Sequence, residues 1–131
     1  MMERWLRQPK NKKNNSIKVK ILSTGEKVHL IQRRQLDKEP QRHFIGVVDA
    51  HEEGIVRVTG HVYTVDTGTF RFFRRPESRT RIISAASGEV LINVLPPSVD
   101  LDKIVYKQEK KWLRISDGSA WHLDISESGW T

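Results

Sequence analysis

The stretch that decides the fold lies at residues 55–75 and reads IVRVTGHVYTVDTGTFRFFRR. Apolar and polar side chains alternate through its first half, and β-branched and aromatic residues dominate throughout, which is typical of strands. A turn signal, Thr67-Gly68, separates two such runs. The stretch therefore predicts an antiparallel β-hairpin.

The two adjacent phenylalanines of this hairpin, Phe72 and Phe73, cannot share a face, because neighbouring side chains of a strand point to opposite sides. A two-residue turn at Thr67-Gly68 pairs Phe73 with Val62 and Phe72 with Tyr63. One face then holds a plausible core of Val56, Val58, Val62 and Phe73. The other holds Tyr63, Val65, Phe70 and Phe72, bordered by Arg57, His61 and Arg74.

The second face has two interpretations. Either another part of the domain covers it, as is common in barrels and sandwiches, or it is an exposed docking surface. Aromatic rings beside arginines suit single-stranded nucleic acid, whose bases stack while guanidinium groups hold the phosphates. They suit a protein interface equally well.

Outward from the hairpin, further short strands are predicted at intervals of about 8–12 residues. They are Ile17–Ile21, Val28–Ile31, Phe44–Ala50, Thr80–Ala85, Val90–Leu95, Ile104–Gln108, Trp112–Ser116 and Ala120–Ser126, with Pro76-Glu77-Ser78 read as a connection between the strands Phe70–Arg74 and Thr80–Ala85. We expect an all-β fold, a small antiparallel barrel or sandwich of about eight to ten strands.

Length and composition narrow the class further. The 131 residues suit one domain. The absence of cysteine excludes disulfides, thiolate zinc sites and cysteine nucleophiles, and it favours a reducing, cytoplasmic location. No apolar run approaches the roughly 20 residues that a membrane span needs.

The net charge of +7 is concentrated in two places. Residues 1–20 hold seven basic residues against Glu3, and residues 69–81 hold five arginines against Glu77. Residues 8–15 contain no apolar side chain, so we expect residues 1–15 to form a disordered basic tail before a single domain at 16–131. The expected binding residues are Lys10, Lys12 and Lys13 in the tail, and Tyr63, Arg71, Phe72, Arg74, Arg75, Arg79 and Arg81 in the domain. Pairing of the arginines with acidic residues in 37–53 and 100–127 is the alternative to ligand binding.

Catalytic patterns are missing. The sequence has no phosphate-binding glycine loop, no nucleophile elbow and no His-Glu-x-x-His motif. A turn centred near residue 52 would make His43 and His61 cross-strand neighbours, but a third clustered metal ligand is lacking. We therefore expect no enzyme, no cofactor and no metal.

Two functional hypotheses follow. The first is a non-enzymatic module that binds RNA or DNA, with the tail supplying electrostatic capture and the arginine–aromatic hairpin supplying orientation. The second is a small accessory subunit of a multiprotein assembly, which docks on an acidic protein surface through the same tail and hairpin face.

Overall fold

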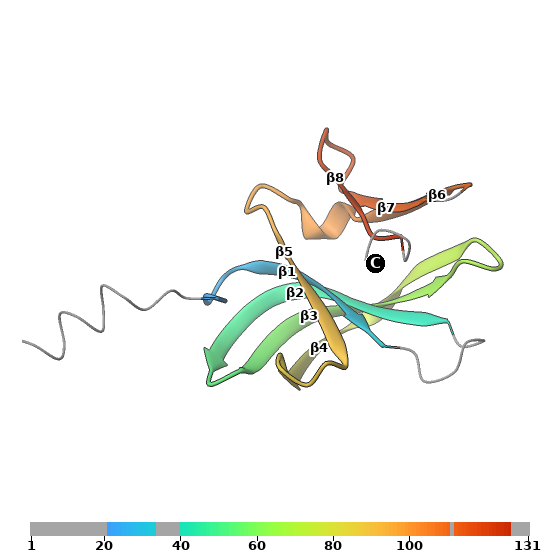
Figure 1. Ribbon diagram of the computed structural model, residues 1–131. Coiled ribbons are helices and arrows are strands. Elements are labelled where there is room, and N and C mark those ends of the chain that lie inside the picture. Colours follow the sequence, from blue (N-terminus) through green and yellow to red (C-terminus); the bar gives the residue numbers. More distant parts are fainter. Residues whose placement is uncertain (1–20, 34–39, 111, 127–131) are drawn as a thin grey trace, which may run out of the picture.

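The computed structural model describes residues 21–33, 40–110 and 112–126. In these ranges the chain forms two antiparallel sheets, which lie one above the other in Figure 1. The strands are β1 (Lys27–Gln32), β2 (Gln41–Glu52), β3 (Ile55–Asp66), β4 (Arg71–Ser84), β5 (Val90–Leu95), β6 (Val105–Glu109), β7 (Trp112–Ser116) and β8 (His122–Asp124), with a short 3-10 helix η1 (Leu101–Lys103) before β6. The all-β prediction is confirmed. The described residues contain no helix long and apolar enough to cross a membrane.

The larger sheet has the strand order β4-β3-β2-β1-β5, and the smaller one has the order β6-β7-β8. The larger sheet ends in two edges, β4 and β5, so the closed-barrel alternative is wrong and the fold is built from two sheets. The predicted tail at 1–15, with Lys10, Lys12 and Lys13, lies outside the described residues. So does most of the predicted strand Ile17–Ile21, whose last residue precedes β1 in a bend.

β1 occupies a central position, because it pairs with β2 on one side and β5 on the other. Its four consecutive residues Val28, His29, Leu30 and Ile31 are all buried. A strand with side chains buried in a row has both of its faces covered. The larger sheet therefore supports a hydrophobic core on each side.

The first core lies between the sheets and consists of Ile31, Ile45, Tyr63, Val65, Leu95, Val99, Leu113, Ile115 and Ile125. The second lies on the opposite face of the larger sheet and consists of Leu22, Val28, Leu30, Phe44, Val48, Val56 and Val58. Partly buried side chains from both edge strands, such as Ile83 and Val90, pack against this second core. The face turned away from the smaller sheet is therefore closed in part by its own outer strands.

The hairpin of β2 and β3 contains a close approach of two backbones, where Gly46 and Gly60 are directly opposite each other. A Cβ at Gly46 would overlap the carbonyl oxygen of Thr59, and one at Gly60 would overlap that of Ile45. Both positions therefore require glycine.

The hairpin of β3 and β4 forms as predicted, but its register differs by two residues. Phe72 is opposite Val65 and Phe73 is opposite Thr64, because residues 67–70 form a longer turn in which Phe70 has a positive φ of 57°. A shift of two residues leaves every side chain on its predicted face. Phe73 nevertheless is 49% exposed and does not join the core, contrary to the prediction.

Pro76 does not end the strand, as the sequence had suggested, but lies inside the 14 residues of β4. The pairing with β3 is irregular at this point, since three residues of β4 are opposite Val62 alone, between the pairs Tyr63–Arg74 and His61–Ser78. Proline lacks a backbone N–H and is tolerated in an edge strand or at a bulge. β4 is an edge strand, and its pairing with β3 is irregular at Pro76, so the proline is tolerated there.

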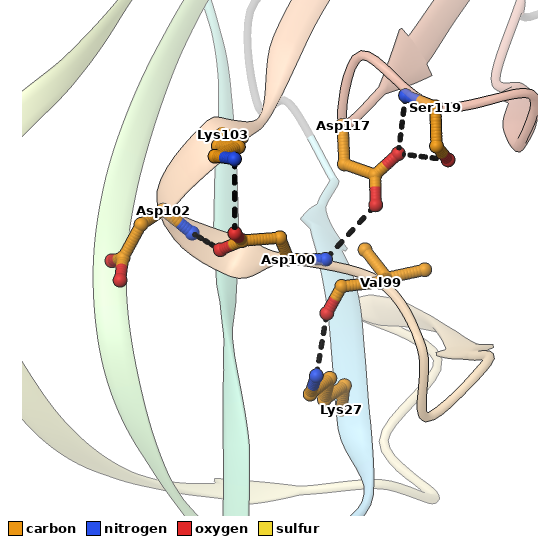
Figure 2. Close-up of polar contacts among 7 residues, drawn as sticks. All are labelled: Lys27, Val99, Asp100, Asp102, Lys103, Asp117 and Ser119. Atoms are coloured by element: carbon orange, nitrogen blue, oxygen red, sulfur yellow. Dashed lines mark hydrogen bonds and ion pairs between the residues drawn. The ribbon is translucent and has the colours of Figure 1, made fainter.

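The connection between β5 and η1 attaches the smaller sheet to the larger one. The Lys27 ammonium on β1 donates to the carbonyl oxygens of Pro97, at 2.7 Å, and of Val99. The next backbone N–H, that of Asp100, donates to Asp117 Oδ2 at 2.9 Å, and the N–H of Ser119 donates to the other carboxylate oxygen (Figure 2). A chain of polar contacts thus runs from β1 to the turn between β7 and β8.

Candidate functional site

A groove of about 560 Å³ lies on the face of the larger sheet that the smaller sheet does not cover. Its floor is mainly aliphatic and belongs to the second core, with Leu30, Phe44, Val58, Val62, Ile83 and Val90. Its rim carries four guanidinium groups, those of Arg42, Arg75, Arg79 and Arg81, and one carboxylate, that of Glu77. Four positive charges against one negative charge make this groove strongly basic.

Three of these arginines share a face because they occupy alternate positions of β4. Side chains two residues apart along a strand lie about 7 Å from each other. Arg75, Glu77, Arg79 and Arg81 occupy successive alternate positions of the strand. The fourth, Arg42, comes from the start of β2. The arginine island identified in the sequence therefore becomes one wall of a groove, and β2 adds a member that the sequence did not reveal.

The groove arginines are only partly neutralised. Arg79 forms an ion pair with Glu77 at 3.7 Å, and both side chains are more than half exposed. The guanidinium carbon of Arg81 lies 6.0 Å from the ring centroid of Phe44, and that of Arg75 lies 5.5 Å from that of Phe73. Among the described residues, Arg75 and Arg81 have no acidic partner within ion-pair distance. Exposed cations in this state are available to an anion.

Arg74 faces the other side of the sheet. Its guanidinium donates to His61 Nε2 at 2.9 Å and lies 3.7 Å from Asp102 of η1. Partial burial and the charge of Arg74 lower the pKa of His61. Arg74 thus follows the alternative of pairing with an acidic residue in 100–127. Arg71, at the first position of β4, is exposed and does not line the groove.

The face that carries Tyr63 and Phe72 is covered by the smaller sheet. Tyr63 is only 4% exposed, and Phe72 packs at the margin of the same core. The ring of Tyr106 on β6 lies 5.6 Å from the Tyr63 ring and stacks on Phe72 at 5.8 Å, measured between centroids. Of the two interpretations left open by the sequence, coverage is the one observed. A base would have to displace Tyr106 to reach Tyr63.

A chain of buried polar side chains crosses the space between the sheets. Its only sign in the sequence is a histidine, His29, inside an apolar strand. His29 Nδ1 lies 3.2 Å from Asn93 Nδ2, and His29 Nε2 lies 3.0 Å from His43 Nδ1. The Tyr106 hydroxyl is 2.9 Å from the same His43 nitrogen, and Gln41 Oε1 is 3.4 Å from His43 Nε2. One direction satisfies the amide and ring groups, with Asn93 donating to His29, His29 to His43 and His43 to Gln41.

Burial lowers the pKa of His29 to about 3. Burial and the neighbouring His29 lower the pKa of His43 to about 2. Both rings are therefore neutral at neutral pH, as the chain of donors and acceptors requires. His43 and His61 are not directly opposite each other, as a turn centred near residue 52 would have made them, because His43 is opposite Tyr63 and His61 is opposite Ile45. Within the described ranges no three His, Cys, Asp or Glu side chains are grouped to hold a metal ion.

The comparisons with known proteins add no relative. No family model, no curated protein and no solved structure matches the chain.

Proposed function

We propose that the protein is a non-enzymatic module that binds single-stranded RNA or DNA in the arginine groove. The observation that carries this proposal is the convergence of Arg42, Arg75, Arg79 and Arg81 on one concave surface with a single carboxylate. Guanidinium groups bind phosphate groups well, frequently with two parallel hydrogen bonds.

The shape of the groove favours a single strand over a duplex. Arg79 and Arg81 lie about 7 Å apart on β4, and Arg75 comes four residues before Arg79 on the same strand. A flexible chain can therefore bring several of its phosphates to these arginines. A duplex is a stiff rod that presents its phosphates on a convex surface, which a groove with an apolar floor accommodates poorly. The floor would contact sugars and bases, and the basic residues of 1–15 would add salt-dependent capture without sequence preference.

Fluorescence anisotropy with labelled oligonucleotides, single-stranded and duplex, tests this function. We expect the single strand to bind more tightly than the duplex of the same sequence, and the variant Arg79→Gln/Arg81→Gln to weaken binding at least about tenfold. Arg57→Gln is the matched control, since Arg57 is an exposed arginine of β3 on the opposite face from Val56 and Val58. Absence of binding at low salt, or equal losses in the groove variant and the control, would overturn the proposal.

A second function, an accessory subunit that docks on an acidic protein surface, is favoured by one further observation. β4 is a 14-residue strand at the edge of the larger sheet, and a free edge can accept an added strand. Its arginines and Pro76 also oppose pairing with a second basic β4 strand. Light scattering after size-exclusion chromatography, with and without an acidic extended peptide, tests this candidate. Binding of the peptide that resists nucleic-acid competition would support it, and a strict monomer that ignores the peptide would exclude it.

A further inference from the structure

The smaller sheet carries a hollow of its own, of about 300 Å³, on the side turned away from the core. Along β7 the residues Leu113 and Ile115 point into the core, so the alternate side chains of Trp112 and Arg114 point outward. These two line the hollow together with Trp121 and with Lys107 and Glu109 of β6. The hollow and the arginine groove lie on different sheets.

Trp112 and Arg114 together form one surface of the hollow. They are two residues apart on one strand, and the guanidinium carbon of Arg114 lies 3.9 Å from the ring centroid of Trp112. Contact at this distance places the guanidinium group directly on the indole face. Bases stack on guanidinium planes as they do on aromatic rings. The surface is therefore of a kind that planar ligands use.

One donor of a residue that lines the hollow has no acceptor among the described residues. The Nε atom of Arg114 is buried and lacks a hydrogen-bond partner among the described residues. A buried N–H without an acceptor destabilises the protein unless water or a ligand supplies one. Asp124 is opposite Arg114 in the sheet, yet no ion pair joins the two within the described part of the chain. The unmet donor distinguishes this hollow from an ordinary solvated tryptophan–arginine contact.

We propose that this hollow is a nucleotide-binding site, in which the base stacks on the Trp112–Arg114 surface and an oxygen of the ligand accepts from Arg114 Nε. Of the charged side chains that line the hollow, Lys107 supplies the cation for the phosphate, because Arg114 also interacts electrostatically with Asp124. The choice of a nucleotide rests on the proposed function. The arginine groove has an aliphatic floor and Tyr63 is covered, so this hollow supplies the base-stacking surface that the groove lacks.

Tryptophan fluorescence with adenosine 5′-monophosphate as the probe tests the site. The protein carries Trp5→Phe and Trp130→Phe, so that Trp112 and Trp121 are the remaining tryptophans. We expect saturable quenching, corrected for absorption by a parallel titration of free tryptophan. Arg114→Lys keeps the charge but loses Nε and the planar group, and it should weaken binding at least about fivefold. Ribose 5-phosphate, which has no base, should bind weakly.

The controls separate this site from the groove. Arg79→Gln/Arg81→Gln should leave the quenching by adenosine 5′-monophosphate unchanged while it weakens oligonucleotide binding. Saturable quenching in a protein that binds no oligonucleotide would reject the groove function and keep the hollow. Quenching that never saturates, an Arg114→Lys titration that superimposes on that of the parent, or equal binding of ribose 5-phosphate would each overturn the nucleotide site. Circular dichroism of Arg114→Lys confirms that the fold is intact.

Discussion

His29 Nε2 lies 3.0 Å from His43 Nδ1 between the two sheets, and neither ring is more than 1% exposed. The pair joins β1 to β2, and Asn93 and Tyr106 extend the contact to β5 and β6. Each hydrogen bond needs one donor and one acceptor. A second proton on either ring would therefore place two donors opposite each other. The interface between the sheets therefore depends on both histidines staying neutral.

Mild acid should destabilise the protein through this pair. Unfolded histidine has a pKa of about 6.5, whereas the folded values are about 3 and 2. The unfolded state therefore binds more protons below pH 6.5, and the free energy of unfolding falls as pH decreases. Two histidines give a slope of up to about 2.7 kcal/mol per pH unit. Urea denaturation between pH 7.5 and 5.5, which lies more than one unit above the ordinary pKa values of carboxylates, measures this slope.

The exposed His122 supplies the control for this prediction. His122→Gln should keep the full slope, and His43→Gln should reduce it by about half, because one of the two groups has been removed. The partly exposed His61, whose pKa is also lowered, adds a smaller contribution of the same sign. An unfolding free energy that stays constant from pH 7.5 to pH 5.5 would rule out the assignment.

The glycine pair of β2 and β3 should not tolerate a methyl group. Gly46→Ala places a Cβ on the carbonyl oxygen of Thr59, and the strands must separate to admit it. We expect a loss of about 2–4 kcal/mol in unfolding free energy, measured by urea denaturation. Gly88→Ala is the comparison, because Gly88 has a positive φ of 79° but open space around it, and it should cost roughly 1 kcal/mol. Equal losses at both positions would contradict the close approach.

Lys27 should stabilise the connection between the sheets. Lys27→Met removes the ammonium group that donates to the carbonyls of Pro97 and Val99 while it keeps an aliphatic side chain. We expect a loss of about 2 kcal/mol, as for hydrogen bonds from a charged donor. Lys103→Met removes only an exposed contact with Asp100 and should change the stability by less than about 0.5 kcal/mol. Equal urea midpoints for the two variants would contradict the prediction.

Salt dependence should reveal how many groove arginines contact phosphates. For single strands, the logarithm of the binding constant falls with that of the salt concentration by about 0.7 per phosphate contact. Arg79→Gln/Arg81→Gln should therefore lower the slope by about 1.4. Arg57→Gln, on the other face, should leave the slope unchanged. Anisotropy titrations at four or more salt concentrations measure this slope. An unaltered slope in the groove variant would mean that the phosphates bind elsewhere.

Several features could be predicted because they are local. The alternation of side chains assigned Phe72 and Phe73 to opposite faces, and this held although the pairing differed by two residues. The continuity of β4 through Pro76 could not be predicted, because a proline ends a central strand but not an edge strand. Whether β4 lies at an edge depends on the order of strands in the sheet, which periodicity does not contain.

The candidate site likewise has features that the sequence shows and features that it does not. The concentration of arginines at residues 71–81 was evident from the sequence, and so was the lack of a catalytic motif. The sequence did not show that Arg42 lines the groove or that Arg74 pairs with Asp102. It also did not show that Tyr106 covers Tyr63. Each of these depends on segments far apart in the chain.

The amino-acid sequence by itself determined most of the described strands, the two faces of the hairpin at residues 55–75 and the segment where the arginines gather, because side-chain alternation and local charge need no knowledge of distant contacts. Only the tertiary structure decided which face stays open. The smaller sheet covers the face of Tyr63 and Phe72, and the arginines of β4 meet that of β2 on the other face. The reason is physical: apolar surfaces from the whole chain decide which face of the larger sheet the smaller sheet covers, and the opposite face carries the second core and, around it, the arginine rim of the groove.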